Sequence, residues 1–319
     1  MRFAVETWAP DYGPSVDGAT LAESDAEVDV SVEHDPGRWS AIAPVAAPAG
    51  CVLFVDGVQR IDAWVWITGD DGVAHQGVCA SWAAGVVRCD GRARLVAAEV
   101  RRGVLCAGAS VDAIATRHGD YRPCPVPGTA GDPVSQALGR ARGDLEGRVA
   151  VATRSHPGGG GATEVDGSAP GLLVVDGPLG DRRHLPGAVG YVKTHHVAYL
   201  PAVQERVATG LRAGERTPLF AIGDRRFRYS WYLRLPGAAT HPWSGVVRCE
   251  ASGDLSRAEA AALADRVTAT LPRFASQPHN DPRAPQNLHP IAGLERELRR
   301  RLGDAALMER ALRRAAAAA

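Results

Sequence analysis

Residues 172–177 read Leu-Leu-Val-Val-Asp-Gly, a short apolar run that ends in an aspartate and a glycine. Such a run is typical of a central strand that is covered on both faces. An earlier stretch, Cys51-Val52-Leu53-Phe54-Val55, has the same form and is followed by Asp56-Gly57. The two matching runs predict strands at the centre of a sheet, with Asp56 and Asp176 at the strand ends.

The regions around these two runs predict more strands. Apolar runs at 61–67 and 73–87 follow the first strand after short turns, which is typical of an antiparallel meander. The Arg-rich stretch 92–106 fits either a fourth strand or a strand–helix junction. Alternating or apolar stretches predict the remaining strands at 27–32, 188–193, 227–235 and 245–250.

Three segments predict helices. Apolar residues recur at three- and four-residue spacing from Val134 to Ala152, the pattern of a helix with one buried face. Ser256 and Glu259 have the spacing of a capping box at the start of a helix over 256–271. A last helix is expected from residue 291 onward, with an interruption at Gly303-Asp304 left open.

Glycine- and proline-rich stretches predict loops over 158–170 and 272–290. The order of strands and helices predicts an α/β (α+β) fold, in which helices flank a mixed sheet and a helical extension follows at the C-terminal end.

Composition limits the class of protein. The chain has 319 residues, a formal net charge of zero, 45% hydrophobic and 23% charged residues, which excludes a disordered chain and a polybasic nucleic-acid binder. No run approaches the ~18 apolar residues of a membrane span, and the start shows no secretory signal pattern. The six cysteines form no Cys-x-x-Cys pair, which favours buried thiols in a reducing compartment. We therefore expect a soluble cytoplasmic protein.

Lys193 is the one lysine of the sequence, beside 35 arginines. Arginine and lysine are not equivalent where a compact point charge is needed. A single lysine that persists in so Arg-rich a chain is therefore a candidate for chemistry, and its place at the end of the strand at 188–193 favours a role near Asp176.

Asp56 and Asp176 are the first candidate ligands for a metal ion. If their strands are neighbours, the two carboxylates repel each other unless a cation lies between them. Oxygen ligands favour Mg²⁺ or Mn²⁺. Glu146, on the helix before the second strand, is the candidate third ligand, with Asp144 and Glu99 as rivals. Asp-Gly is also a common turn dipeptide, so each aspartate alone has an ordinary structural interpretation.

Two regions of the sequence place histidines near these carboxylates or near a helix start. His195 and His196 are adjacent in the chain and point to opposite faces of a strand, so we expect them to be mainly structural. The segment 283–290 combines Arg, Asn and His before a helix, a composition that suits anion binding. Within it, His289 is a candidate general acid or base.

These motifs resemble the NurA family of DNA-repair nucleases. The likeness spans roughly residues 50–300 and rests on the early strand with Asp-Gly, the helical glutamate, the strand "LLVVDGPL", the following "GYVK" and a C-terminal histidine. Membership would imply an RNase H-like core, Mn²⁺- or Mg²⁺-dependent cleavage of DNA, a homodimer, and partnership with a HerA-type hexameric ATPase. The family's Tyr-Pro before the histidine is absent here, where Leu271-Pro272 and a proline-rich loop stand.

The resemblance assigns Asp56, Glu146 and Asp176 to metal binding, and adds Lys193 and His289 as catalytic residues. It also divides the chain into an N-terminal extension (1–48), a nuclease domain (49–300) and a helical tail (301–319). Two functions are then expected: a metal-dependent DNA nuclease acting in DNA end processing, or a non-catalytic RNase H-like module that binds DNA or a partner ATPase.

Overall fold

The computed structural model describes residues 22–24, 26–69, 72–127, 132–155, 171–223, 227–237 and 240–318. The chain forms two compact units, each built from three separate segments. The first unit comprises Met1–Phe54, Arg88–Arg94 and Pro157–Ala292, and the second comprises Val55–Val87, Leu95–His156 and Gly293–Ala319. These bounds cut across the predicted boundaries at 48/49 and 300/301, which remain predictions.

The first unit is built on a mixed sheet. Its strands are hydrogen-bonded in the order β2-β10-β11-β12-β8-β7, followed by the beginning of β3. Strands β7 and β8 are parallel, and the pairs from β2 to β8 are antiparallel. The bounds are β2 (Glu27–Asp29), β7 (Leu172–Asp176), β8 (Ala188–Val192), β10 (Phe220–Gly223), β11 (Arg228–Arg234) and β12 (Val246–Ser252). A separate parallel pair joins β1 (Ala22–Glu23) and β9 (Val197–Ala198).

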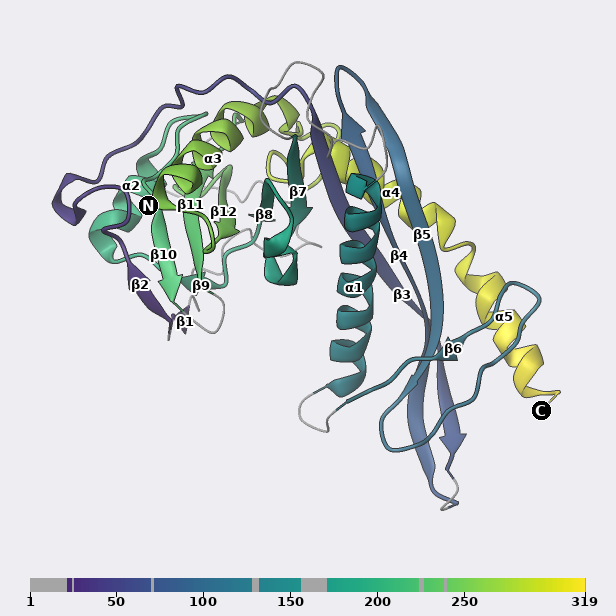
Figure 1. Ribbon diagram of the computed structural model, residues 1–319. Helices are drawn as coiled ribbons and strands as arrows, with labels where there is room; N and C mark the ends of the chain where they lie inside the picture. The colour runs from purple at the N-terminus through teal and green to yellow at the C-terminus, as the bar shows by residue number, and fades with distance from the viewer. Residues whose placement is uncertain are drawn as a thin grey trace, which may run out of the picture. The chain divides into compact units, whose positions relative to one another are not determined.

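Helices cover the sheet of the first unit (Figure 1). Helix α3 (Arg257–Thr270) packs against β11 and β12, and the predicted capping box of Ser256 and Glu259 is present at its start. Helix α2 (Ala202–Gly210) contributes Ala208 to an apolar cluster with the sheet. Short 3-10 turns lie at η2 (Pro36–Arg38), η3 (Gly180–His184) and η4 (Leu271–Phe274). The buried members of the apolar cluster to which Ala208 belongs are Trp39, Leu200, Ala208, Leu211, Phe220, Ile222, Tyr232 and Val246.

The second unit contains the long strands of the chain. Its strands follow the order β3-β4-β5-β6, with bounds β3 (Val52–Thr68), β4 (Ala74–Cys89), β5 (Ala93–Cys106) and β6 (Arg122–Pro123). Neighbouring strands joined by connections as short as those after β3 and β4 run antiparallel. The antiparallel order predicted for the runs 61–67 and 73–87 is therefore confirmed, and 92–106 is a strand rather than a strand–helix junction.

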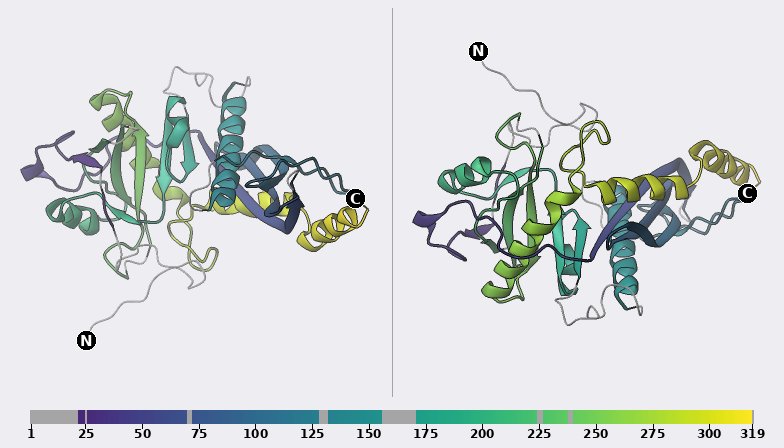
Figure 2. Two further views of the ribbon diagram at one scale, coloured as in Figure 1. Left: turned by 90° about the horizontal axis from the view of Figure 1, so that it is seen from below. Right: turned by 90° about the horizontal axis from the view of Figure 1, so that it is seen from above.

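Helices α1 (Pro133–Ser155) and α4 (His289–Arg301) pack on the strands of the second unit, and α5 (Ala305–Ala316) follows α4. Figure 2 shows α1 and the second-unit part of α4 on opposite faces of β3–β5. Contacts agree with this view: a Cβ placed at Gly57 of β3 would meet Arg142 and Glu146 of α1, whereas one at Gly85 of β4 would meet Leu294 and Leu298 of α4.

Buried ionic networks tie separate segments together within each unit. In the first unit, Arg216 is 2% exposed and donates to both carboxylate oxygens of Glu33, at 2.8 and 2.7 Å, and to Asp265 at 2.7 Å. In the second unit, buried Asp62 accepts from Ser81 Oγ at 2.5 Å and from Tyr121 Oη at 2.9 Å. Both networks satisfy charges that would be costly to bury alone.

The structure confirms the predicted α/β class: a mixed sheet with flanking helices, and a C-terminal helical segment interrupted at Gly303-Asp304. One element differs. The runs predicted as separate strands at 51–55 and 61–67 form the single strand β3, so Asp56 lies within a strand rather than at its end. The predicted loop 158–170 lies outside the described residues. Within the described residues, no helix has both the length and the apolarity that crossing a membrane requires.

Candidate functional site

Asp176 and Lys193 form an ion pair at one edge of the first unit's sheet. Asp176 is the last residue of β7 and pairs in register with Tyr191 of the parallel neighbour β8. Because parallel neighbours end at the same edge of a sheet, Lys193, just after β8, reaches back to Asp176. The distance from Lys193 Nζ to Asp176 Oδ2 is 2.7 Å, and the side chains are 10% and 12% exposed. After Asp176 the chain turns at Gly177, whose φ of +94° favours glycine.

The loop before α4 holds Lys193 from a second direction. Lys193 Nζ donates to Asn287 Oδ1 at 3.0 Å, and Asn287 Nδ2 donates to Asp281 Oδ2 at 2.8 Å. Asn287 and Asp281 are both buried. The two partners fix which way the Asn287 amide faces, since its oxygen must accept from the ammonium and its nitrogen must donate to the carboxylate.

Tyr191 anchors the same loop to β8. Its hydroxyl donates to the Gln286 carbonyl oxygen at 2.7 Å, and Gln286 Nε2 donates to the Lys193 carbonyl at 3.3 Å. Burial, with smaller effects from Cys249 and Asp176, raises the pKa of Tyr191 well above its usual value. The phenol therefore remains a neutral donor, and the loop holds Asn287 against Lys193.

Asp176 keeps one carboxylate oxygen for a further partner. Oδ2 receives the lysine ammonium, while Oδ1 is buried and accepts no hydrogen bond from any described residue. A buried carboxylate oxygen without a partner costs free energy. A hard cation bound to Oδ1 would remove that cost, so this oxygen fits a divalent-cation ligand.

Asp56 and Glu295 form a carboxylate pair in the second unit. Asp56 is 5% exposed, and its Oδ1 accepts from the Gly57 N–H at 2.7 Å. A carboxylate oxygen of Glu295, on α4, lies within 4.8 Å of one from Asp56. Two carboxylates at that separation repel each other unless a cation or a proton compensates, so this pair also fits a cation site.

Glu146 is not brought together with Asp56. It is 4% exposed, lies 3.4 Å from Arg142 Nε, and its side chain meets β3 at Gly57 on the face covered by α1. Successive strand residues point to opposite faces, so Asp56 points to the other face, where Glu295 lies. Of the two rivals, Asp144 is exposed on α1 and Glu99 forms an ion pair with Arg101.

No protein-family model matches this sequence, and no curated protein matches it either. The resemblance to the NurA family thus stays a prediction, and the arguments below rest on the residues themselves.

The three histidines divide as follows. His289 is the first residue of α4 and is exposed. His195 is buried and donates from Nε2 to the Val246 carbonyl at 3.0 Å, and His196 is exposed. The burial of His195 beside exposed His196 agrees with the structural role expected from strand alternation.

Sequence reasoning missed three residues of the site. Glu295 lies between Leu294 and Leu298 on a helix with a strong apolar face, which is an unusual place for a carboxylate and was a usable signal. Asn287 lies in the segment that was singled out for anion binding, yet its partner is the lysine ammonium. Asp281 gave no signal, because loop aspartates are common.

Proposed function

We propose that this chain is a divalent-cation-dependent phosphodiesterase that cleaves DNA, and that Asp176 of the first unit and the Asp56–Glu295 pair of the second unit supply carboxylate ligands for divalent cations. The observation that carries the proposal is the bonding of Asp176, which is paired with Lys193 through one oxygen while its other oxygen is buried and has no partner among the described residues. A carboxylate can hold a divalent cation and an ammonium group can stabilise negative charge on a phosphate, so the Asp176–Lys193 pair supports phosphate chemistry at this sheet edge.

Asp56 and Glu295 support the proposal through their chain positions. Strand β3 begins beside β7, where the Leu172 N–H donates to the Cys51 carbonyl at 3.2 Å, and Asp56 follows along the same strand. Helix α4 begins two residues after Asn287, and Glu295 lies on it. The residue just before the strand that carries Asp56 is thus hydrogen-bonded to the first residue of β7, which ends in Asp176. The helix that carries Glu295 begins close in sequence to Asn287, the partner of Lys193.

A divalent cation, when bound, polarises a phosphoryl oxygen and activates a water molecule. Mn²⁺ or Mg²⁺ is the expected ion, since all the proposed ligands are carboxylate oxygens. Lys193 is proposed to contact a phosphate oxygen and offset its charge, which is supported by the hydrogen bond that Asn287, itself held by Asp281, accepts from its ammonium. His289, exposed at the start of α4, is proposed to exchange protons with the reacting groups.

The broader proposals rest on the resemblance to the NurA family. They are a role in DNA end processing during double-strand break repair, an RNase H-like core, a homodimer and a HerA-type hexameric ATPase partner. A cytoplasmic location is proposed as well, supported by the six cysteines, all of which are free thiols in the described residues.

Cleavage of end-labelled linear DNA tests the proposal. Purified protein is incubated with single- and double-stranded substrates in Mn²⁺, Mg²⁺ or EDTA. Asp176→Asn and Asp56→Asn should each lower the rate by about a hundredfold or more, because a charged cation ligand is lost. The matched control is Asp144→Asn, at an exposed carboxylate of α1, which should cleave like the wild type. Cleavage that persists in EDTA, or in a folded Asp56→Asn/Asp176→Asn double variant, would falsify the proposal.

The same assay identifies the third ligand. Glu295→Gln should abolish cleavage, whereas Glu146→Gln should leave it near the wild-type rate, because Glu146, on α1, meets the face of β3 opposite to the Asp56 side chain. The reverse result would restore the ligand set predicted from the sequence. Binding of Mn²⁺ measured by calorimetry should follow the same order in the folded variants.

A second candidate function, a non-catalytic binding module, is favoured by a different surface. In the second unit, Trp64 and Trp66 are 64% and 71% exposed beside a groove of about 770 Å³ that α5 also lines. Large exposed rings of this kind mark interaction surfaces. If the groove joins two copies of the chain, Trp64→Ser/Trp66→Ser should turn a dimer into a monomer in light scattering. A dimer of unchanged mass would exclude that use of the groove.

A further inference from the structure

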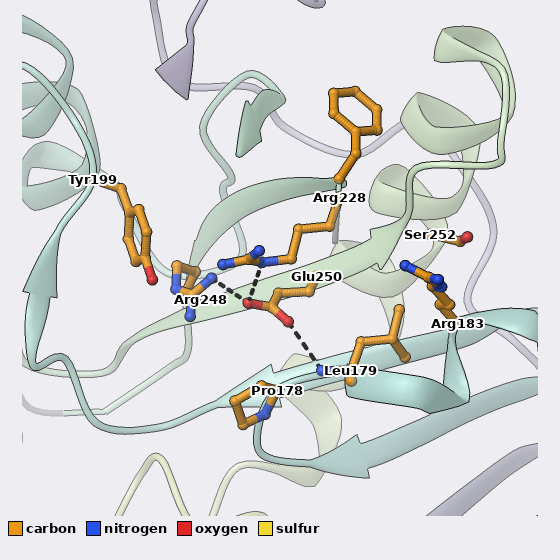
Figure 3. Close-up of a pocket in the computed structure, with 10 residues that line it drawn as sticks. Pro178, Leu179, Arg183, Tyr199, Arg228, Arg248, Glu250 and Ser252 are labelled. Carbon is orange, nitrogen blue, oxygen red and sulfur yellow. Dashed lines mark hydrogen bonds and ion pairs between the residues drawn. The ribbon is translucent and has the colours of Figure 1, made fainter. Parts of the chain in front are cut away.

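An arginine-lined pocket lies on the face of the first unit's sheet opposite to the face that the Asp176 side chain occupies. In register, Asp176 pairs with Tyr191 and Tyr191 pairs with Cys249, so these three share one face. Glu250 follows Cys249 in β12 and therefore points to the opposite face. The pocket lined by Glu250 is thus separate from the proposed catalytic edge, and it lies wholly within the first unit (Figure 3).

The pocket carries an excess of positive charge. Its lining includes Arg183, Arg228 and Arg248 against the single carboxylate of Glu250. Glu250 is 1% exposed and pairs with Arg228 at 3.1 Å and with Arg248 at 2.5 Å. Its Oε2 also accepts from the Leu179 N–H at 2.9 Å. One carboxylate cannot neutralise three guanidinium groups, so the pocket favours an anionic ligand.

Glu250 is a positioning group for the arginines. Burial raises the pKa of Glu250, but the charge of Arg248, the Leu179 N–H and Arg228 outweigh burial, so its pKa lies below the ordinary value. The carboxylate therefore stays ionised and holds both guanidinium groups toward the pocket, as Figure 3 shows. Glycine at 190 makes this possible, since a Cβ there would lie 2.5 Å from the Leu179 nitrogen.

Two arginines have donors for a ligand. Arg248 uses only Nη1 in hydrogen bonds to described residues, so Nε and Nη2 remain available. Arg183 is exposed and makes no ion pair within the described part of the chain. Arginine donates in a planar fork that matches two oxygens of a phosphate.

Aromatic rings and cavity size define the rest of the ligand. The Arg248 guanidinium lies 4.8 Å from the centre of the Tyr199 ring, and Phe227, also in the lining, is 47% exposed. The cavity of about 490 Å³ is far larger than a bare phosphate ion needs and is typical of small-molecule sites. We propose that this pocket binds a nucleoside monophosphate group, either a free nucleotide or the 5′-phosphorylated end of a DNA strand, with Arg183 and Arg248 on the phosphate and the aromatic rings against the base.

Calorimetry on the full chain in EDTA tests the proposal. The probes are deoxyadenosine 5′-monophosphate, deoxyadenosine, inorganic phosphate, and one oligodeoxynucleotide with and without a 5′-phosphate. The monophosphate should bind with a 1:1 ratio and deoxyadenosine at least about tenfold more weakly, because the charged hydrogen bonds are lost. Tighter binding of the phosphorylated oligonucleotide than of the free nucleotide identifies the DNA end as the source; the opposite order identifies the nucleotide.

Variants at exposed positions keep the fold intact. Arg183→Gln should weaken binding of the monophosphate about tenfold or more, whereas Arg257→Gln, at an exposed arginine of α3 outside the pocket, should not. Binding of deoxyadenosine as tight as that of the monophosphate, binding of inorganic phosphate as tight as that of the monophosphate, equal effects of the two variants, or no binding would each overturn the assignment. Asp176→Asn should bind normally, so this test is independent of the proposed nuclease activity.

Discussion

Protonation of His195 should limit the stability of the first unit in mild acid. The side chain is 4% exposed, donates to the Val246 carbonyl at 3.0 Å, and lies against the rings of Tyr232 and Trp243. Burial lowers its pKa from 6.5 to about 4, and the nearby positive charge of Arg248 adds to the effect. The folded protein therefore keeps His195 neutral at a pH where the unfolded chain protonates it.

The size of the effect follows from proton linkage. Above pH 6.5 both states carry a neutral His195, so the free energy of unfolding is undiminished. Below pH 6.5 the unfolded state binds a proton at His195, whereas the folded state binds it only when the pH reaches about 4. The free energy of unfolding therefore falls across that interval. At about pH 5 the loss is about 2 kcal/mol, and the whole shift corresponds to about 3 kcal/mol.

Urea unfolding of the wild type and His195→Gln measures this loss. Glutamine is neutral at every pH used and can still donate to the Val246 carbonyl. Between about pH 7.5 and about pH 5, the wild type should lose about 2 kcal/mol more than the variant, since all other titrating groups are shared. Tryptophan fluorescence reports the transition, because Trp243 contacts His195. A pH dependence that is the same in both proteins within about 0.5 kcal/mol would refute the argument.

Three further outcomes are expected. Lys193→Met should lower DNA cleavage by about a hundredfold, because a methionine cannot offset phosphate charge, while Mn²⁺ binding measured by calorimetry should persist; an unchanged rate would remove the lysine from the mechanism. Arg216→Met should lower the free energy of unfolding by about 3–5 kcal/mol, because two carboxylates lose their buried partner. Urea unfolding checks this against Arg212→Met, at an exposed site, and equal effects would contradict it. Tyr121→Phe should lower thermal stability by about 1–3 kcal/mol, because buried Asp62 loses a donor; an unchanged melting temperature would argue against that hydrogen bond.

The sequence was informative wherever one segment determines its own structure. The apolar run at 172–175 predicted β7, and the spacing from Val134 onward predicted α1. Ser256 and Glu259 predicted the start of α3, because a capping box needs only residues three positions apart. Periodicity and caps are local, so they can be read without knowing the tertiary structure.

The two Asp-Gly pairs show the limit of predictions made from short stretches of sequence. The sequence predicts a strand end at both, which is correct for Asp176, where Gly177 has the positive φ of a turn. It was wrong for Asp56, because Gly57 continues the strand and serves another purpose. Its missing side chain makes room for Arg142 and Glu146 of α1. The same dipeptide thus has two physical causes, and only helix packing distinguishes them.

The sequence could not rank Glu295 above Glu146 as a candidate third carboxylate, for a similar reason. Glu146 and Glu295 both lie on helices next to apolar residues, and each is a reasonable ligand when its helix is considered alone. What separates them is the face of β3 that each helix covers. Such information exists only in the packed structure, as does the placement of Asn287 against Lys193.

The interleaved segments of the two units have a consequence for folding during synthesis. All residues of the first unit have left the ribosome once Ala292 has emerged, whereas the second unit still lacks Gly293–Ala319. Strands β4 and β5 are synthesised early. The surface around Gly85 of β4 stays uncovered until Leu294 and Leu298 have been synthesised and can pack against it. An apolar surface left open for that long is a target for chaperones and for aggregation. A chain that ends before α4 should therefore be less soluble than the loss of so short a segment would indicate. The reason is that the apolar surface of the second unit then stays uncovered.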